Sequence, residues 1–293
     1  MMPVGVAPRL VSVIVPTRNA EPWISDQLRA LEAQTYPGDW EVLVVDNGCT
    51  DRSIEIAGSF AHRLPALRIV DARRRRSLNH ARNVGAQAAR GDFLAFCDAD
   101  DVVAPSWLGA LVAAAPGADI IGGALEVSTL NPPELHAWRP VEPPRELERE
   151  HGFLPYAAGG NCGIWTSVAR ELEWDERFRF GSSDVEFCWR AQLRSYTTAF
   201  AGDAVVMMRY RRSLARLVAQ YFAYGRSGPL LYRAFRAQGM PRDVRGGLWW
   251  WRWIVSRPAD LVRSRARRGY WLRTAAFRCG RLVGSVAAGV FFP

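Results

Sequence analysis

The alternation of apolar and mixed segments in the N-terminal third of the chain constrains the fold more than any other feature. Short apolar runs occur at residues 11–16, 41–46, 67–72 and 93–98, and the first two are rich in Val. The segments between them, 21–35, 51–60 and 78–90, are compatible with helices. Apolar runs of this length are typical of strands that are buried on both faces. The alternation therefore predicts an α/β fold, with a mostly parallel sheet flanked by helices.

An acidic side chain ends the second of these runs. Asp46 is followed by Asn47 and Gly48, which favour a turn, and Thr50-Asp51 is expected to open the next helix. In open α/β sheets, ligands bind just beyond the carboxyl ends of the strands. Asp46 is therefore either a ligand-binding residue or a structural acid that stabilises the turn.

The fourth run ends in an acidic cluster, Cys97-Asp98-Ala99-Asp100-Asp101. Residues two apart in an extended chain share a face, so Asp98 and Asp100 are expected to point the same way. Two carboxylates on one face repel each other unless a cation joins them, and their hard oxygen ligands suit Mg²⁺ or Mn²⁺. The pair predicts a divalent metal site. A solvent-exposed acidic turn is the alternative.

Four segments in this order resemble the family 2 glycosyltransferases, which have the GT-A fold. They are PTRN (16–19), VDNGCTD (45–51), ARNVGAQAARGDFLAFCDADD (81–101) and FGSSDVEFCWR (180–190). The resemblance covers roughly residues 10 to 210. It implies an inverting enzyme that moves one sugar from a nucleotide-sugar donor, with UDP the commonest nucleotide. The acceptor would be a hydroxyl of an envelope glycan, a lipid-linked molecule or a natural product.

The resemblance also implies roles for individual residues. Donor binding is implied for Pro16, Thr17, Asn19, Asp46, Arg82, Asn83, Asp98 and Asp100. Asp98 and Asp100 would hold Mg²⁺ or Mn²⁺ on the donor diphosphate. Several family members carry a His after their last strand, where this chain reads Val205-Val206-Met207-Met208-Arg209. Because a thioether is a poor ligand for these ions and the four histidines are expected to lie elsewhere, we predict weak metal binding without the donor.

Asp184 is the residue that matches the family's catalytic base. Ser183 and Glu186 have the spacing of a capping box, which predicts that Asp184 lies in the first turn of a helix. A carboxylate there could deprotonate the acceptor hydroxyl as it attacks the anomeric carbon. The alternative is an acid that only complements the helix dipole. Ser183 stands where the family usually has Glu, and it is expected on the acceptor side with Gly160 and Asn161, for which a simple tight turn is the alternative.

The C-terminal third is basic and rich in tryptophan. All 38 basic residues of the chain are Arg, the formal net charge is +9, and bases dominate after residue 205. Trp and Arg on helical spacing favour the interface of an anionic membrane. The longest apolar stretch, Leu282 to Pro293, is too short to span a bilayer, which needs about 20 residues. We therefore expect either peripheral membrane attachment or helices that pack on the catalytic part or on a second copy in a homodimer.

These observations predict a catalytic domain at residues 1–212 and a helical, basic region at 213–293. The donor would be bound by about residues 1–101 and the acceptor by about 102–212. Five scattered cysteines, with neither a regular framework nor a CxxC pair, and no recognisable signal peptide favour a cytoplasmic protein, with any membrane attachment on the inner face. The sequence lacks the Q-x-x-R-W motif of processive synthases, which favours single-sugar transfer.

Two other functional classes are consistent with parts of the sequence. One is a catalytically silent protein that binds nucleotide sugars or acts as a membrane scaffold, which the departures at Ser183 and Met207 keep open. The other is a nucleic-acid-binding protein, but the chain has no recognisable binding module and such a role would not use the acidic clusters. We therefore expect no nucleic-acid partner.

Overall fold

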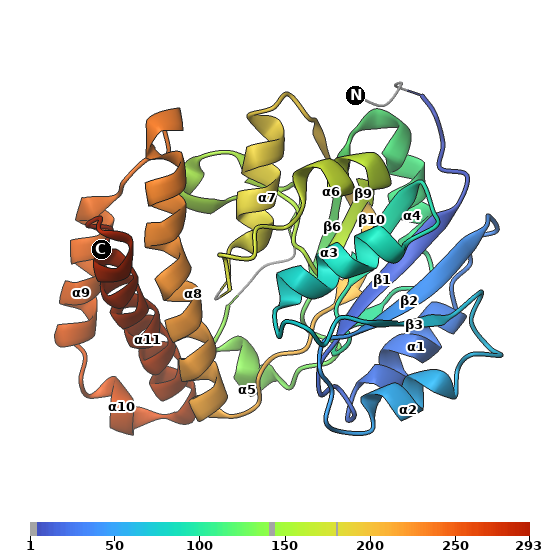
Figure 1. Ribbon diagram of the computed structural model, residues 1–293. Coiled ribbons are helices and arrows are strands. Elements are labelled where there is room, and N and C mark those ends of the chain that lie inside the picture. The colour runs from blue at the N-terminus through green and yellow to red at the C-terminus, as the bar shows by residue number, and fades with distance from the viewer. Residues whose placement is uncertain (1–4, 141–143, 180) are drawn as a thin grey trace.

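The computed structural model describes residues 5–140, 144–179 and 181–293 (Figure 1). Its larger sheet has the order β3-β2-β1-β4-β9-β6-β10-β5. The strands are β1 (Val11–Thr17), β2 (Trp40–Asp46), β3 (Arg68–Asp71), β4 (Phe93–Cys97), β5 (Val102–Val103), β6 (Ile120–Glu126), β9 (Asn161–Trp165) and β10 (Thr198–Met207). A small second sheet pairs β7 (Glu148–Arg149) with β8 (Pro155–Tyr156).

The four strands predicted from the sequence form a parallel block. β3, β2, β1 and β4 pair in parallel, with Thr17 opposite Asp46 at the ends of β1 and β2. Every residue of β1 and β4 is buried, which explains their continuous apolar runs. β9 joins the sheet antiparallel to both β4 and β6, so the sheet is mixed. The prediction of a mostly parallel sheet is confirmed.

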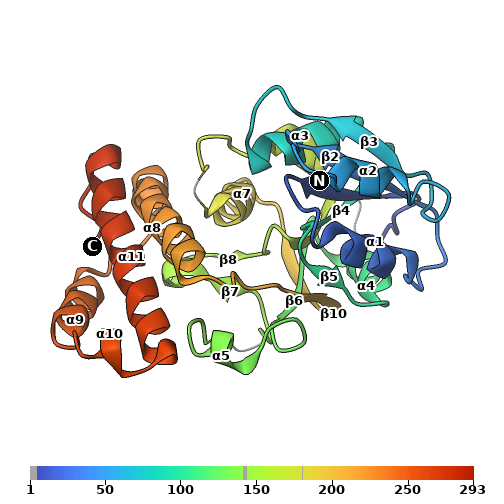
Figure 2. The same cartoon turned by 90° about the horizontal axis from the view of Figure 1, so that it is seen from below.

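Helices cover both faces of this sheet. In Figures 1 and 2, α3 (Leu78–Ala88) lies on one face, and α1 (Ile24–Glu32) and α4 (Trp107–Ala114) lie on the other. The remaining helices of this part are α2 (Ser53–Gly58), α5 (Pro133–His136), α6 (Thr166–Leu172) and α7 (Ser183–Gln192). Short 3₁₀ turns lie at Ala115–Gly117, Glu150–Gly152 and Arg236–Gln238. Residues 141–143 of the Pro-rich stretch and Phe180 of the FGSSDVEFCWR motif lie outside the described residues.

The basic C-terminal region is helical, as the sequence predicts. It contains α8 (Leu214–Phe235), α9 (Val244–Val255), α10 (Asp260–Arg263) and α11 (Arg265–Ala288). These helices group at the end of the molecule opposite β3 (Figures 1 and 2). Leu231, Phe235 and Phe292 share a buried cluster with Trp189 of α7. The C-terminal helices therefore pack on the rest of the chain.

Candidate active site

The carboxyl ends of β1 and β2 hold the first group of predicted donor-binding residues. One oxygen of Asp46, Oδ1, accepts hydrogen bonds from the backbone N–H groups of Gly48 at 3.0 Å and Cys49 at 2.8 Å. The other, Oδ2, lies 3.8 Å from Nε of Arg73. Asp46 thus stabilises its turn with one oxygen and leaves the second for a polar partner. The structural and ligand-binding interpretations are compatible.

Three predicted neighbours of Asp46 contribute differently. Pro16 and Thr17 are buried at the end of β1, and the Thr17 hydroxyl donates to the carbonyl of Val15 at 3.0 Å. Asn19 has a left-handed backbone (φ 50°), and its Oδ1 accepts from the backbone N–H of Thr50 at 2.8 Å. The prediction that Thr50-Asp51 opens a helix is wrong by two residues. The helix α2 begins at Ser53, whose backbone N–H donates to Oδ1 of Asp51.

Arg82 presents a buried positive charge to a cavity that Asp98, Asp100 and Asp184 also line. Only 3% of the residue is exposed, and its guanidinium carbon lies 4.5 Å from the ring centroid of Trp174. Its Nη2 is 3.8 Å from Oδ1 of Asp98, its Nη1 makes a long 3.5 Å bond to Ser183 Oγ, and its Nε has no partner. A buried cation with such weak partners favours an anionic ligand.

Asn83, the neighbour of Arg82 in the sequence, has a structural position. Its amide oxygen accepts from the backbone N–H of Trp174 at 2.7 Å, and its Nδ2 donates to the Trp174 carbonyl at 2.9 Å. Both ends of the side chain are therefore used to hold Trp174 against α3. This position does not support the donor-binding role predicted for Asn83.

Asp98 and Asp100 both line the cavity, but the extended segment that was predicted to bring them to one face is absent from this described part of the chain. β4 ends at Cys97, and residues 98–101 form a turn rather than an extended segment. Burial raises the pKa of the Asp98 carboxyl; Arg82 opposes this effect, and the nearby Asp100 and Asp184 add to it. Asp100 Oδ2 forms an ion pair with Nη1 of Arg211 at 2.8 Å.

The two acids fit a divalent cation only as part of a larger ligand set. Their hard oxygens suit Mg²⁺ or Mn²⁺, and a bound cation would offset the burial and the neighbouring carboxylates that raise the pKa of Asp98. Within residues 5–140, 144–179 and 181–293, no group of three or more His, Cys, Asp or Glu could hold a metal. Water and a ligand diphosphate would therefore have to complete the coordination.

The segment after β10 places arginines, rather than a histidine, beside these acids. The Arg209 backbone N–H donates to Asp101 Oδ1 at 2.8 Å, and Arg211 pairs with Asp100. None of the four histidines lies in this segment, although His151 lines another part of the cavity. Burial lowers the pKa of His151 to about 3, so it is neutral, and its ring lies 3.3 Å from Nη2 of Arg281.

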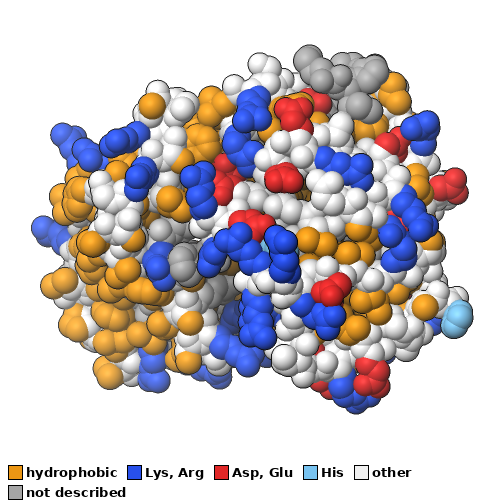
Figure 3. All heavy atoms as spheres, in the orientation of Figure 1, with side chains coloured by type: hydrophobic (Ala, Val, Ile, Leu, Met, Phe, Trp, Pro, Cys, Tyr) orange, Lys and Arg blue, Asp and Glu red, His pale blue; other side chains and the backbone are white. Residues whose placement is uncertain are grey.

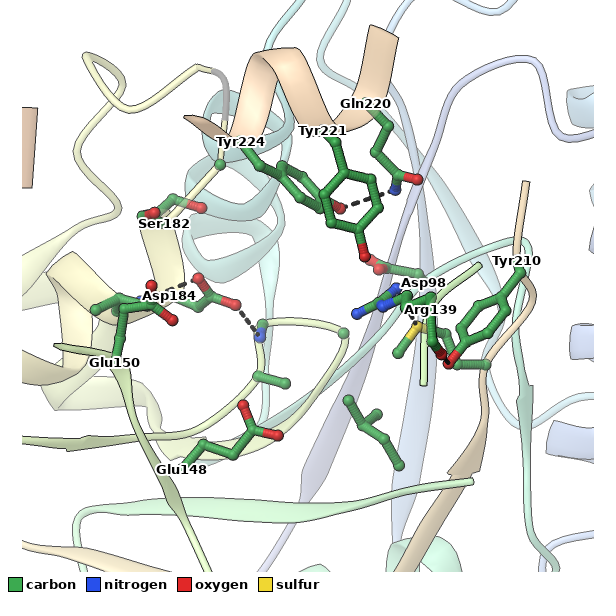
Figure 4. Close-up of a pocket in the computed structure, with 18 of the residues that line it drawn as sticks. Asp98, Arg139, Glu148, Glu150, Ser182, Asp184, Tyr210, Gln220, Tyr221 and Tyr224 are labelled. Atoms are coloured by element: carbon green, nitrogen blue, oxygen red, sulfur yellow. Dashed lines mark hydrogen bonds between the residues drawn. The ribbon is translucent and has the colours of Figure 1, made fainter. Parts of the chain in front are cut away.

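Asp184 lies in the first turn of α7, as predicted, and faces the cavity (Figure 4). Its Oδ2 accepts from the backbone N–H of Gly159 at 3.1 Å, and its Oδ1 accepts from that of Val185 at 3.0 Å. Both carboxylate oxygens therefore accept backbone hydrogen bonds at the N-terminus of α7. The residue is thus held in place as a hydrogen-bond acceptor.

The capping box predicted around Asp184 is wrong. The residue before the helix is Ser182, in a left-handed conformation and without a side-chain cap. Ser183 instead receives the long bond from Arg82, while Glu186 forms an ion pair with Arg190 at 2.6 Å. Glu186 is buried and engaged by this arginine, which gives it a structural role.

In the segment Gly159-Gly160-Asn161, the two glycines border the cavity, whereas Asn161 has a structural role. Ideal Cβ atoms would lie 2.7 Å from Arg82 Nη2 at Gly159 and 2.5 Å from Asp98 Oδ2 at Gly160, so only glycine allows this approach. Asn161 is fully buried in β9; its Oδ1 accepts from Trp107 Nε1 and its Nδ2 donates to the carbonyls of Ala124 and Ala204. The structure does not support the acceptor-side role predicted for Asn161.

Substitution of Gly160 by Ala tests this close approach. The added methyl group must displace the Asp98 carboxylate, so nucleotide affinity in the presence of Mn²⁺ should fall several-fold while the chain stays folded. Isothermal titration with nucleoside diphosphates measures the loss. Gly109→Ala on α4 is the control, since its Cβ would meet no atom within 4 Å. Equal affinities for the two variants would show that Gly160 does not position Asp98.

The cavity also has a wall that the sequence analysis missed. The cavity has a volume of about 510 Å³ and extends from Arg82, Asp98, Asp100 and Asp184 to the C-terminal helices. Its further lining includes Arg139, Glu148, Glu150, Tyr156, Tyr221, Tyr224, Arg273 and Arg281. Figure 4 shows Tyr221 and Tyr224 projecting from α8 into the space between Asp184 and Arg139. Their spacing of three residues on one helix face is the signal that would have indicated a shared surface.

Residues of this wall interact electrostatically with Asp184. The Tyr156 hydroxyl donates to Glu148 Oε2 at 2.8 Å. Burial raises the pKa of Glu150, and the nearby Asp184 and Glu148 add to the rise while Arg281 opposes it. Pro16, Thr17, Asn19 and Asp46 are not among the described residues that line this cavity. The cavity thus joins the acidic turn after β4 to a tyrosine- and arginine-rich surface.

Comparisons with known proteins agree with this architecture. The model of the family described as glycosyl transferase family 2 matches residues 12–173. Glycosyltransferase EpsJ from Bacillus subtilis is 37% identical over 190 residues, which are 61% of this chain and 53% of EpsJ. The chain therefore matches about half the length of that relative.

Two solved structures are similar over nearly the whole chain. One is the mannosyltransferase PcManGT from Pyrobaculum calidifontis in complex with GDP-Man and Mn²⁺, with a TM-score of 0.62 at 20% sequence identity. The match covers 96% of this chain and 88% of the PcManGT chain. The other is TarS 1–349 from S. aureus in complex with UDP-GlcNAc, with a TM-score of 0.56 at 18% sequence identity. That match covers 97% of this chain and 93% of the TarS chain. At these identities the likeness supports the fold alone.

Proposed function

This chain belongs to glycosyl transferase family 2, and we propose that it is an inverting enzyme that transfers one sugar from a nucleotide-sugar donor to an acceptor hydroxyl. The observation that carries the proposal is the shared cavity of Arg82, Asp98, Asp100 and Asp184. It combines a cation, a pair of hard oxygen ligands and a held carboxylate. These are the groups needed to bind a diphosphate and to accept a proton.

The donor would lie along the carboxyl ends of β1, β2 and β4. The free oxygen of Asp46 would accept a hydrogen bond from the base or ribose, next to Pro16, Thr17 and Asn19. Arg82 and Arg211 would face the diphosphate, because both guanidinium groups already lie beside the acidic turn. Asp98 and Asp100 would hold Mg²⁺ or Mn²⁺. The ion, when bound, would neutralise charge on the leaving diphosphate.

Asp184 would act as the general base. Its carboxylate would take the proton from the acceptor hydroxyl as the hydroxyl oxygen bonds to the anomeric carbon and the sugar–phosphate bond breaks. The backbone N–H of Gly159 fixes one carboxylate oxygen, so the acceptor would approach a lone pair of defined direction. Attack from the face opposite the diphosphate inverts the anomeric configuration.

A donor screen tests this proposal. The chain would be melted with UDP, GDP and dTDP and with their sugars, each with and without Mn²⁺. We expect the melting temperature to rise with one nucleotide, and to rise further with Mn²⁺, since a ligand that binds only the folded state stabilises it. UDP is the expected nucleotide, although PcManGT is described with GDP-Man. The absence of any shift with every nucleotide would contradict the proposal.

A catalytically silent member of the family is the second candidate. Two features favour it: Ser183 replaces the usual acid before Asp184, and Arg211 already occupies Asp100. Such a protein would bind the nucleotide sugar and release no nucleoside diphosphate over time. The retention of Asp98, Asp100 and Asp184 around one cavity favours the enzyme.

The C-terminal helices would also attach the protein to an anionic membrane surface. In the described part of the chain no helix is both long and apolar enough to cross a bilayer. Figure 3 shows hydrophobic side chains gathered over these helices, with arginines at the margins. The large exposed apolar residues there are Leu248, Trp249, Val255, Val262, Leu282, Val283, Val286 and Phe291. Such a surface suits peripheral binding to anionic lipid.

Point substitutions test membrane attachment better than truncation. Removing residues 249–293 would also remove Arg273 and Arg281 from the cavity. We expect the combined variant Val255→Asp, Val262→Asp and Val286→Asp to leave acidic vesicles in a sedimentation assay while nucleotide binding persists. Binding of the unaltered chain should weaken as salt rises, because exposed charges are screened. The control is Leu193→Asp, at an exposed apolar residue outside these helices. Equal vesicle binding by both variants would contradict attachment through these helices.

A further inference from the structure

Arginines gather on the acceptor side of the cavity without acidic partners. No ion pair joins Arg139, Arg273 or Arg281 to a carboxylate within the ranges that the structure describes. The guanidinium of Arg139 donates a long 3.5 Å contact to the sulfur of Met208. Arg281 is 7% exposed, bonds the Pro293 carbonyl and His151, and leaves its Nε unpartnered. Glu150 lies in the same wall and acts on Arg281, so the positive charge that lacks an acidic partner among the described residues is that of Arg139 and Arg273.

Six of the described acids line the cavity, and each is engaged away from Arg139 and Arg273. Asp184 accepts from the backbone N–H groups of Gly159 and Val185. Oε1 of Glu150 lies 3.3 Å from Nε2 of His151, beside Arg281. Asp98 faces Arg82, Asp100 pairs with Arg211, and Asp101 accepts from the backbone of Arg209. Glu148 accepts from the Tyr156 hydroxyl. None of these acids forms an ion pair with Arg139 or Arg273 within the part of the chain that the structure describes. Arg139 and Arg273 are half-buried, and charged groups that lose part of their water need a partner of opposite sign. These two arginines therefore indicate a site for an external anion.

Two of the arginines pack on the faces of tyrosine rings. The guanidinium carbon of Arg273 lies 5.2 Å from the ring centroid of Tyr221 and 4.6 Å from that of Tyr270. That of Arg139 lies 5.1 Å from the Tyr210 ring centroid. An arginine packed on a ring face keeps its in-plane N–H groups, which match the oxygens of a phosphate or carboxylate. In Figure 4, Arg139 and Tyr221 face the same space.

The origin of these residues separates them from the proposed diphosphate position. Arg82 and Arg211 contact the acids that follow β4. Arg139 instead follows α5, and Arg273 belongs to α11. Both therefore come from the part of the chain that borders the cavity away from β1 and β2 (Figure 2). A nucleotide that lies along β1, β2 and β4 would leave them free.

We propose that Arg139 and Arg273 bind an oxyanion on the acceptor, so that the acceptor is an anionic molecule with a phosphate or carboxylate group near its reactive hydroxyl. This inference rests on the proposed transferase function and narrows its substrate class. Tyr221 and Tyr224 would contact the uncharged part of the acceptor between this anion and Asp184. Arg281 would add positive charge at the rear of the same wall.

The test uses the full chain, saturated with the nucleoside diphosphate that the donor screen identifies. Phenyl phosphate, benzoate and the neutral phenyl glucoside are titrated by calorimetry, so the three arms separate phosphate, carboxylate and uncharged ligands. We expect one of the two anions to bind and the glucoside not to bind. Arg139→Gln and Arg273→Gln should each weaken anion binding by at least about tenfold, as expected for loss of a charge-assisted hydrogen bond. Arg252→Gln, at an exposed arginine of α9, should leave it unchanged.

Variants that keep the charge guard against loss of folding. Arg139→Lys and Arg273→Lys keep the positive charge but lose the planar fork, and each should weaken anion binding several-fold. The inference is overturned if the anions bind no better than phenyl glucoside, if the Gln and Lys variants bind them as the unaltered chain does, or if saturating nucleotide abolishes their binding. Nucleotide binding is measured on the same samples. If the unaltered chain failed to bind any nucleotide, that result would contradict the proposed function rather than this inference.

Discussion

Replacement of Asp184 by Asn is expected to slow sugar transfer by roughly two to four orders of magnitude, the usual share of general-base catalysis. Asn has nearly the same size and keeps the position at the start of α7. It offers one acceptor oxygen where the carboxylate offers two, to the N–H groups of Gly159 and Val185. Nucleotide binding should change little, because Asp46, Arg82 and the acidic turn would hold the donor.

The neighbouring acid provides a matched comparison. Glu186 lies in the same turn of α7, but its carboxylate pairs with Arg190 at 2.6 Å. Glu186→Gln should lower the melting temperature and keep most of the transfer rate. Initial rates with a saturating donor and a competent acceptor distinguish the two variants. If Asp184→Asn transferred sugar near the normal rate while Glu186→Gln did not, Glu186 would be the base.

Replacement of Asp100 by Ala is expected to abolish metal-dependent donor binding, the second large effect. With only two protein carboxylates, Mn²⁺ should bind measurably only when a nucleoside diphosphate supplies further oxygens. Asp98→Ala should weaken this binding without abolishing it. Calorimetric titration of Mn²⁺, with and without nucleotide, measures both effects. Tight binding of Mn²⁺ to the free protein would contradict this prediction.

Arg211 gives the metal prediction a structural control. Its guanidinium forms the 2.8 Å ion pair with Asp100 and so competes with a cation for the same carboxylate. Arg211→Ala should therefore raise the affinity of the nucleotide-free protein for Mn²⁺. Arg212→Ala, at an exposed residue next in the chain, should not. Unchanged metal affinity in Arg211→Ala would show that the ion pair does not limit binding.

The sheet could be predicted from the sequence because its determinants are local. Runs such as VSVIV and FLAFC are apolar at every position, and β1 and β4 are buried throughout. The acids at strand ends follow from the same pattern, since the parallel strands around Asp46 and Asp98 end at one edge of the sheet. Asp184 in the first turn of α7 was also predictable.

The failures concern side chains whose partners lie far away in the sequence. Asn161 was predicted to lie on the acceptor side or in a tight turn, but Trp107, Ala124 and Ala204 saturate its amide within the sheet. The capping box failed because Arg190, one helical turn after Glu186, forms a stronger charge-assisted contact. The tyrosine and arginine wall depends on α8 and α11 folding back onto the cavity, which no local pattern specifies.

The release of nucleoside diphosphate from its sugar conjugate tests the central claim most directly. Transferases often lose sugar to water, so the assay needs no knowledge of the acceptor. The full chain should release nucleoside diphosphate from at least one nucleotide sugar, faster with Mn²⁺ than without it, and Asp100→Ala should remove the effect of Mn²⁺. If the folded chain bound a nucleotide sugar and released no nucleoside diphosphate with any acceptor or with water, the enzyme assignment would be contradicted in favour of a silent binding protein.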